Sequence, residues 1–127
     1  MMKLHPISNT SFELFGIAIT PIEVSHYWLP VYGFRIGDLA YITDANSISD
    51  INFEKLRGVK YFIINALRKY KHISHYNLEE AIDLIKRVNP QKGYLTHVGH
   101  QMGLYKEVSR ILPEGVILAY DRLSFEF

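Results

Sequence analysis

The strongest constraint on the fold is a change of hydrophobic period in the middle of the chain. The run from Val59 to Leu67 is almost continuously apolar and has the length of a strand buried on both faces. A helix is then expected from Asn77, which is followed three residues later by Glu80 in a capping-box pattern, and Pro90 ends it. Lys92 to His97 is another expected strand. Strands therefore alternate with helices, which is typical of an α/β domain with helices packed on a sheet.

The flanking segments are expected to complete the layers. Before Asp44, glycines and prolines separate short apolar runs, which predicts an antiparallel meander. A short helix ending at Gly58 and a third helix from Met102 to Leu112 are also expected. The other expected strands are Phe12 to Thr20, Ile22 to Tyr27, Tyr32 to Ile36, Leu39 to Thr43, and a final hairpin of Val116 to Tyr120 with Leu123 to Phe127. Residues 1 to 127 are expected to form a single domain.

Composition limits the classes of partner. Fourteen Lys and Arg against thirteen Asp and Glu give a formal net charge of +1, so neither nucleic acid nor an anionic membrane surface is indicated. Apolar stretches are far shorter than the ~20 residues of a membrane span. The absence of Cys excludes disulfides and thiolate zinc sites. Because no signal-peptide pattern opens the chain, we expect a cytoplasmic protein.

Candidate site residues stand where strands are expected to end, the place where α/β folds gather ligands. They are His26, Asp44 and His97. His75 precedes a helix, whose free backbone N–H groups and dipole favour an anion such as phosphate. Each residue taken alone equally fits an ordinary cap or turn role. The i, i+3 pairs His72/His75 and His97/His100 fall in expected loops, where this spacing does not bring two rings together, so spacing leaves both interpretations open.

Seven segments in one order carry a family resemblance. They are Ile22 to His26, Leu29 to Arg35, Tyr41 to Asn46, Asn65 to Arg68, Ser74 to Ala81, Tyr94 to Gln101 and Leu118 to Asp121. Together they resemble the second half of a metallo-β-lactamase-fold metal-dependent hydrolase, and the branch they most resemble is the phosphoribosyl cyclic phosphodiesterases of phosphonate breakdown. The resemblance implies an α/β fold equivalent to the C-terminal half of the αββα metallo-β-lactamase sandwich.

The same resemblance implies roles for individual residues around two divalent metal ions, Zn or Mn. It implies that His26 binds the first ion, His97 the second, and that Asp44 bridges both. His75 is similar to the group that faces substrate phosphate as general acid or electrostatic clamp, and His100 to a supporting or substrate-side group. The implied substrate is a small phosphodiester or nucleotide-like molecule, whose attacking and leaving oxygens two ions about 3.5–4 Å apart would clamp.

One departure from the family pattern changes the expected activity. The motif H-x-H-x-D-H, which supplies further ligands to both ions, is absent. Three ligands shared by two ions leave each ion with two protein contacts, fewer than the three of a catalytic zinc. We therefore expect a truncated form or fragment that is inactive alone, with weak or absent metal binding. The alternatives are a non-catalytic binding or assembly module, and half of a split enzyme completed by a second chain. Arg122 also replaces a glycine common in the family.

An uncovered meander predicts self-association. Large apolar residues alternate along the Phe12 to Thr43 meander, and a bare sheet face is a template for association. Identical chains most often cover such a patch by two-fold contact. We therefore expect a homodimer, or a domain-swapped pair, joined through the meander.

Overall fold

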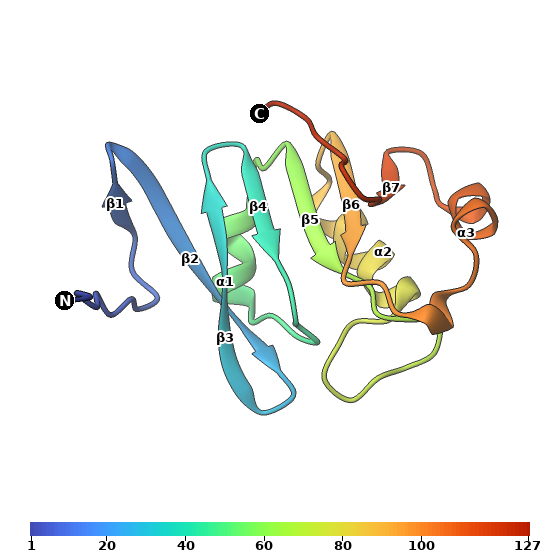
Figure 1. Cartoon of the computed structure of the whole chain (residues 1–127), viewed down its shortest axis with the longest axis horizontal. Coiled ribbons are helices and arrows are strands. Elements are labelled where there is room, and N and C mark those ends of the chain that lie inside the picture. Colours follow the sequence, from blue (N-terminus) through green and yellow to red (C-terminus); the bar gives the residue numbers. More distant parts are fainter.

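In a computed structural model that describes residues 1–127, seven strands form one mixed sheet whose strand order follows the chain (Figure 1). The strands are β1 Phe12–Leu14, β2 Ile17–His26, β3 Leu29–Ile36, β4 Leu39–Ile42, β5 Tyr61–Asn65, β6 Lys92–Thr96 and β7 Val116–Leu118. The helices are α1 Asp50–Phe53, α2 Leu78–Val88 and α3 Tyr105–Ile111, with 3-10 turns η1 Glu54–Leu56 and η2 His100–Met102. The predicted α/β class and the layered architecture are confirmed.

The strand directions bring several loops to one edge of the sheet. β2, β3 and β4 pair antiparallel in turn, so β2 and β4 run in the same direction. β4, β5, β6 and β7 then pair parallel. The carboxyl ends of β2, β4, β5, β6 and β7 therefore share an edge, and the loops that leave this edge carry the candidate site residues.

The core lies between one face of the sheet and the helices α1 and α2, which Figure 1 shows behind the strands. Ala40 and Phe62 are neighbours on this face and are 0% exposed. The next residue across the sheet is Gly93. A Cβ there would lie 2.6 Å from the Cγ2 atom of Ile85, so the glycine allows α2 to pack closely on β6.

Helix α2 begins as the sequence predicts. The side chain of Asn77 accepts a hydrogen bond from the Glu80 backbone N–H at 2.9 Å, and the Glu80 carboxylate accepts one from the Asn77 N–H at 3.0 Å. The helix ends at Asn89, which has a left-handed φ of 55°. These local contacts satisfy N–H groups that a helix start otherwise leaves unpaired.

Two predicted strand boundaries near the N-terminus are wrong. The strand expected over Phe12 to Thr20 is broken by a turn at Phe15 and Gly16, which have φ values of 51° and 80°. β2 instead continues through Pro21 to His26 as one strand. The proline is tolerated because β1 pairs only with the first three residues of β2, so that the side of Pro21 away from β3 is a sheet edge that needs no N–H donor.

The predicted C-terminal hairpin is also wrong. Only β7, Val116–Leu118, forms a strand, and Leu123–Phe127 does not pair with it. The tail instead crosses the sheet face opposite the helices. The Phe125 ring stacks on Tyr94 with centroids 4.6 Å apart and lies 5.3 Å from the Tyr61 ring. Aromatic burial on this face therefore determines the path of the tail.

Positive φ angles explain the remaining differences. The helix expected from Met102 to Leu112 is divided into η2 and α3 because Gly103 has a φ of 104°, which no helix contains. Arg122 has a φ of 69° and so occupies the left-handed region that a glycine would adopt without strain. No helix in the structure combines the length and the apolar character needed to cross a membrane.

Candidate metal centre

Three of the candidate residues occupy the ends of parallel-running strands. His26 is the last residue of β2, Asp44 follows β4 by two residues, and His97 directly follows β6. Asp44 and His97 both have left-handed backbones, with φ values of 57° and 54°. Asp and His adopt this conformation more readily than most residues, and it clusters at functional sites. The backbone turns sharply at the two positions where side chains must converge.

The donor atoms of Asp44, His75 and His97 lie within 4.8 Å of one another. Asp44 Oδ1 is 3.2 Å from His97 Nδ1 and 3.6 Å from His75 Nε2. Donors bonded at 2.0–2.2 Å to one tetrahedral ion lie roughly 3.3 Å apart. The two separations from Asp44 are close to this value, and the group, spread over as much as 4.8 Å, would have to contract slightly around one ion. Two imidazoles and a carboxylate favour a metal such as Zn or Mn. The residues present therefore fit the divalent metal that the family resemblance implies.

Hydrogen bonds between loops hold this cluster in place. The buried side chain of Asn65, the last residue of β5, accepts from the Ala45 N–H at 2.8 Å and donates to the Ala45 carbonyl at 2.9 Å. The Tyr76 N–H donates to the same carbonyl, and the Gly99 N–H donates to the Leu67 carbonyl, both at 2.8 Å. The segments that carry the site are thus joined through their main chains.

His26 and His100 have different positions relative to the cluster. The His26 ring is half-buried and meets the His75 ring edge-on, with centroids 4.8 Å apart, although its donor atoms are outside the group of three. The His26 ring thus contacts the His75 ring, which in turn stacks on His97, and the convergence of His26 itself with Asp44 and His97 stays a prediction. His100 begins η2, is exposed and is not a member of the group.

His75 is the most enclosed member, with 12% of its side chain exposed. Its ring stacks on the His97 ring at a centroid distance of 4.9 Å. Burial lowers the pKa of His75, the neighbouring His97 and His26 imidazoles lower it further, and Asp44 opposes them. His75 is therefore kept neutral, which is the state that binds a metal ion.

The sequence analysis missed two groups beside His75. The His72 Nδ1 atom lies 3.3 Å from His75 Nδ1, and the Ser74 hydroxyl lies 2.9 Å from His75 Nδ1 and 3.3 Å from His72 Nδ1. The expectation that His72 and His75 do not come together in a loop is therefore wrong. Their i, i+3 spacing was the available signal, because the turn in this loop brings the two rings together as a helix would.

Comparisons with known proteins identify the family. A family model described as a beta-lactamase superfamily domain matches residues 1–98. The chain belongs to the beta-lactamase superfamily. The chain is similar to a diphosphatase of the PhnP family, with a TM-score of 0.95 and 35% sequence identity over 98% of this chain and 49% of that one. The predicted resemblance to the metallo-beta-lactamase fold is confirmed.

Two further proteins are similar to this chain over part of their own length. An octanoyltransferase of Porphyromonas gingivalis strain W83 is 34% identical over 126 residues, which is 98% of this chain and 26% of the relative. The metallo-beta-lactamase fold protein YhfI from Bacillus subtilis shares the fold, with a TM-score of 0.68 and 19% identity over 87% of this chain and 49% of that one. The chain thus spans about half the length of the two solved relatives and about a quarter of the octanoyltransferase.

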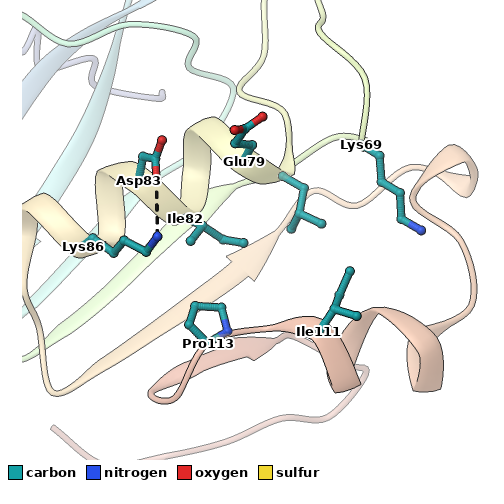
Figure 2. A pocket seen from close by; sticks show the side chains of 8 residues that line it. Lys69, Glu79, Ile82, Asp83, Lys86, Ile111 and Pro113 are labelled. Atoms are coloured by element: carbon teal, nitrogen blue, oxygen red, sulfur yellow. Dashed lines mark ion pairs between the residues drawn. The ribbon is translucent and has the colours of Figure 1, made fainter.

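Two hollows of the surface differ in their position relative to the cluster. A cleft of about 460 Å³ lies between α2 and the segment that ends α3, and Figure 2 shows the Asp83–Lys86 ion pair on its wall. None of the clustered residues lines this cleft. A smaller hollow of about 280 Å³ is lined by His97 together with Tyr120 and Asp121. Of these two hollows, the smaller one adjoins the candidate metal cluster, through His97.

Proposed function

We propose that this chain provides part of the metal centre of a metal-dependent hydrolase that cleaves a phosphodiester or diphosphate bond. The observation that carries the proposal is the convergence of Asp44, His75 and His97 from three segments distant in sequence, with donor atoms within 4.8 Å. Membership of the beta-lactamase superfamily and similarity to a diphosphatase support the same chemistry.

The clustered residues have separate tasks in this proposal. Asp44 and His97 hold the metal, and the His26 ring lies edge-on to the His75 ring beside them. A bound divalent ion supplies a water of lowered pKa and positive charge for the phosphate oxygens. His75 faces either the substrate, as the family resemblance implies, or the metal, since its Nε2 is 3.6 Å from the Asp44 carboxylate.

The proposed substrate is a small phosphodiester or nucleotide-like molecule, with Zn or Mn as the metal. The hollow beside His97 is the proposed seat of its organic part, since Tyr120 offers an aromatic wall and the Asp121 carboxylate can accept hydrogen bonds from hydroxyl or amino groups. His100, exposed at the start of η2, remains a proposed substrate-side group.

The chain alone is proposed to have little or no turnover. Its donors are too few to give two ions three protein ligands each, so donors beyond those of these 127 residues would be needed for a dinuclear centre. A split enzyme completed by a second chain is consistent with this shortage. A non-catalytic binding module is the competing hypothesis, and the cytoplasmic location stays a prediction.

Metal titration with matched variants tests the proposal. Calorimetry with Zn²⁺ is expected to show one weak site that Asp44→Asn and His97→Gln abolish, whereas Asp83→Asn, which removes an exposed acid of α2, leaves it unchanged. Hydrolysis of bis(p-nitrophenyl) phosphate is expected to be absent or slow. Zinc binding that is indifferent to Asp44→Asn would remove the basis of the proposal, and two tight sites with turnover would refute the shortage of ligands.

We further propose that two copies associate through the meander. Leu14 and Ile17 are 49% and 54% exposed, and covering such apolar area stabilises by about 25 cal/mol per Å². Light scattering should then give twice the 14.8 kDa chain mass. Ile17→Glu should restore the monomer, whereas the control Ile51→Glu, on the 80% exposed Ile51 of α1, should not. A wild-type monomer would contradict this proposal.

A further inference from the structure

The turn between β2 and β3 holds the only tryptophan of the chain in an exposed position. β2 ends at His26 and β3 begins at Leu29, so the connection consists of Tyr27 and Trp28 alone. These two residues are 53% and 77% exposed. Two-residue hairpin turns most often contain Gly, Asn or Asp, which adopt the backbone angles of the turn without strain. The turn itself therefore gives no reason for two aromatic rings in solvent.

The strained backbone of this turn is held by a side chain of the loop that follows β4. Tyr27 has a φ of 60°, and a bulky residue keeps this uncommon conformation where surrounding contacts fix the segment. The Tyr27 N–H donates to Asn46 Oδ1 at 2.9 Å. Asn46 Nδ2 in turn donates to the Ile73 carbonyl at 3.0 Å. Because Asn46 lies two residues after Asp44, one amide joins the turn to the loop of Asp44 and to the loop that carries His75.

The turn consequently stands beside the metal cluster. Figure 1 shows the β2–β3 hairpin and the loop between β5 and α2 extending beyond the ends of β4 and β5. The Cα atom of Trp28 lies at most about 7.6 Å from that of His26, because consecutive Cα atoms are about 3.8 Å apart. The His26 ring meets the His75 ring with centroids 4.8 Å apart. A substrate that extends from the cluster past His26 therefore reaches the turn.

The turn and the hollow beside His97 flank the cluster. In the sheet, β4 and β5 lie between the β2–β3 pair on one side and the β6–β7 pair on the other. Trp28 belongs to the first side, and Tyr120, which lines the hollow, belongs to the second. A phosphodiester or a substituted diphosphate carries an organic group on each side of the bond to be cleaved. The two aromatic positions therefore match a substrate with two such groups.

The chemistry of an exposed indole ring favours a nucleobase as one of these groups. Aromatic rings attract one another in offset stacks, because the negative face of one ring meets the positive edge of the other. A base that stacks on an aromatic side chain is bound through its face, so the contact accepts any base. In a nucleotide-like substrate the base is the flat ring, whereas the sugar and the phosphate are not.

We infer that Trp28 is a stacking platform for a nucleobase of the substrate, and that the substrate is a nucleotide diester or a substituted nucleoside diphosphate. The inference rests on the proposed function, because it names the substrate class of that same centre. It excludes a cyclic phosphate of a bare sugar, which has no base to place on the indole ring. Trp28 then determines specificity for the presence of a base and not for its identity.

Fluorescence of the single tryptophan tests this contact without any need for turnover. The chain is titrated in the presence of Zn²⁺ with adenosine 5′-monophosphate and with ribose 5-phosphate, which has the same sugar and phosphate but no base. The nucleotide should quench the Trp28 emission, whereas ribose 5-phosphate should not. Calorimetry should show about tenfold tighter binding of the nucleotide, as stacking of one base provides. Adenosine, which lacks the phosphate, should bind more weakly than the nucleotide.

Substitutions in two turns separate stacking from other effects. Trp28→Ala should weaken binding of the nucleotide about tenfold and leave the affinity for ribose 5-phosphate unchanged. Trp28→Phe retains a smaller ring and should have an intermediate effect on the nucleotide alone. Phe15→Ala is the matched control, because Phe15 is also a fully exposed aromatic residue of a hairpin turn, at the opposite end of β2, and its removal should change neither affinity.

The outcomes distinguish this inference from the function on which it rests. A wild-type chain that binds no zinc, or binds zinc but neither phosphate ligand, contradicts both. Equal affinities for the nucleotide and ribose 5-phosphate, or an unchanged nucleotide affinity in Trp28→Ala, overturn the inference alone. Adenosine that binds as tightly as the nucleotide also overturns it, because the ring would then act apart from the cluster. A Trp28 emission that shifts to shorter wavelength as the chain concentration rises would show that a second copy covers the ring, and would overturn it as well.

Discussion

Asn65→Ala should be strongly destabilising, because the Asn65 side chain hydrogen-bonds both the backbone N–H and the backbone carbonyl of Ala45, the residue after Asp44. Asn65 and Ala45 are both 0% exposed, and their two hydrogen bonds are 2.8 and 2.9 Å long. The Ala45 carbonyl still accepts from the Tyr76 N–H in the variant. Losing its hydrogen bond from Asn65 should therefore cost about 0.5–1.5 kcal/mol, as for an ordinary hydrogen bond. The Ala45 N–H keeps no partner, and burying it unpaired costs about 1–3 kcal/mol. The expected total is about 1.5–4.5 kcal/mol.

Urea denaturation followed by circular dichroism measures this loss, and thermal unfolding should show a Tm lower by about 10 °C. Gln91→Ala is the matched control, because it removes an exposed amide and should change the free energy of unfolding by less than about 0.5 kcal/mol. Zinc affinity of Asn65→Ala should fall as well, since Asp44 directly precedes Ala45. A cost below about 1 kcal/mol, or an equal cost in the control, would refute the reasoning from buried hydrogen bonds.

Three other substitutions or conditions test the packing and the charges. Gly93→Ala should destabilise by about 1–3 kcal/mol, because its Cβ would lie 2.6 Å from Ile85, and a loss under about 0.5 kcal/mol would mean that α2 shifts freely. Arg122→Gly should raise the free energy of unfolding by about 0.5–1 kcal/mol by removing left-handed strain, and a decrease would contradict that assignment. Because the folded-state pKa of His75 is below its ordinary 6.5, the unfolded chain takes up a proton that the folded chain refuses, so metal-free stability should fall as the pH drops below about 6.5. His75→Gln should flatten that decrease in urea titrations at several pH values, and an unchanged slope would exclude His75 as its source.

Elements fixed by local contacts could be predicted from the sequence, whereas elements fixed by distant contacts could not. The capping box of Asn77 and Glu80 depends on residues three apart, and it was predicted correctly. The continuation of β2 through Pro21 depends on where β1 stops pairing, which no local pattern contains. The tail after β7 follows the aromatic rings of Tyr61 and Tyr94, which lie on other strands.

The candidate site shows the same division. His26, Asp44 and His97 could be placed at strand ends by pattern, and parallel strand directions bring such ends together. The contact of His72 with His75 could not be predicted, because a loop's path depends on backbone hydrogen bonds such as that from Tyr76 to Ala45. The histidine pair is visible in the sequence, but no local pattern indicates that the two Nδ1 atoms meet.

The simple strand order of the sheet has a consequence for folding kinetics. Each hydrogen-bonded pair of neighbours, from β1 with β2 to β6 with β7, consists of strands consecutive in the chain. Each pairing therefore closes only the loop between two successive strands, and the entropy lost in closure grows with the length of that loop. The sheet can therefore form one strand at a time, starting from any hairpin or βαβ unit, because no strand pairs with one that is distant in the sequence.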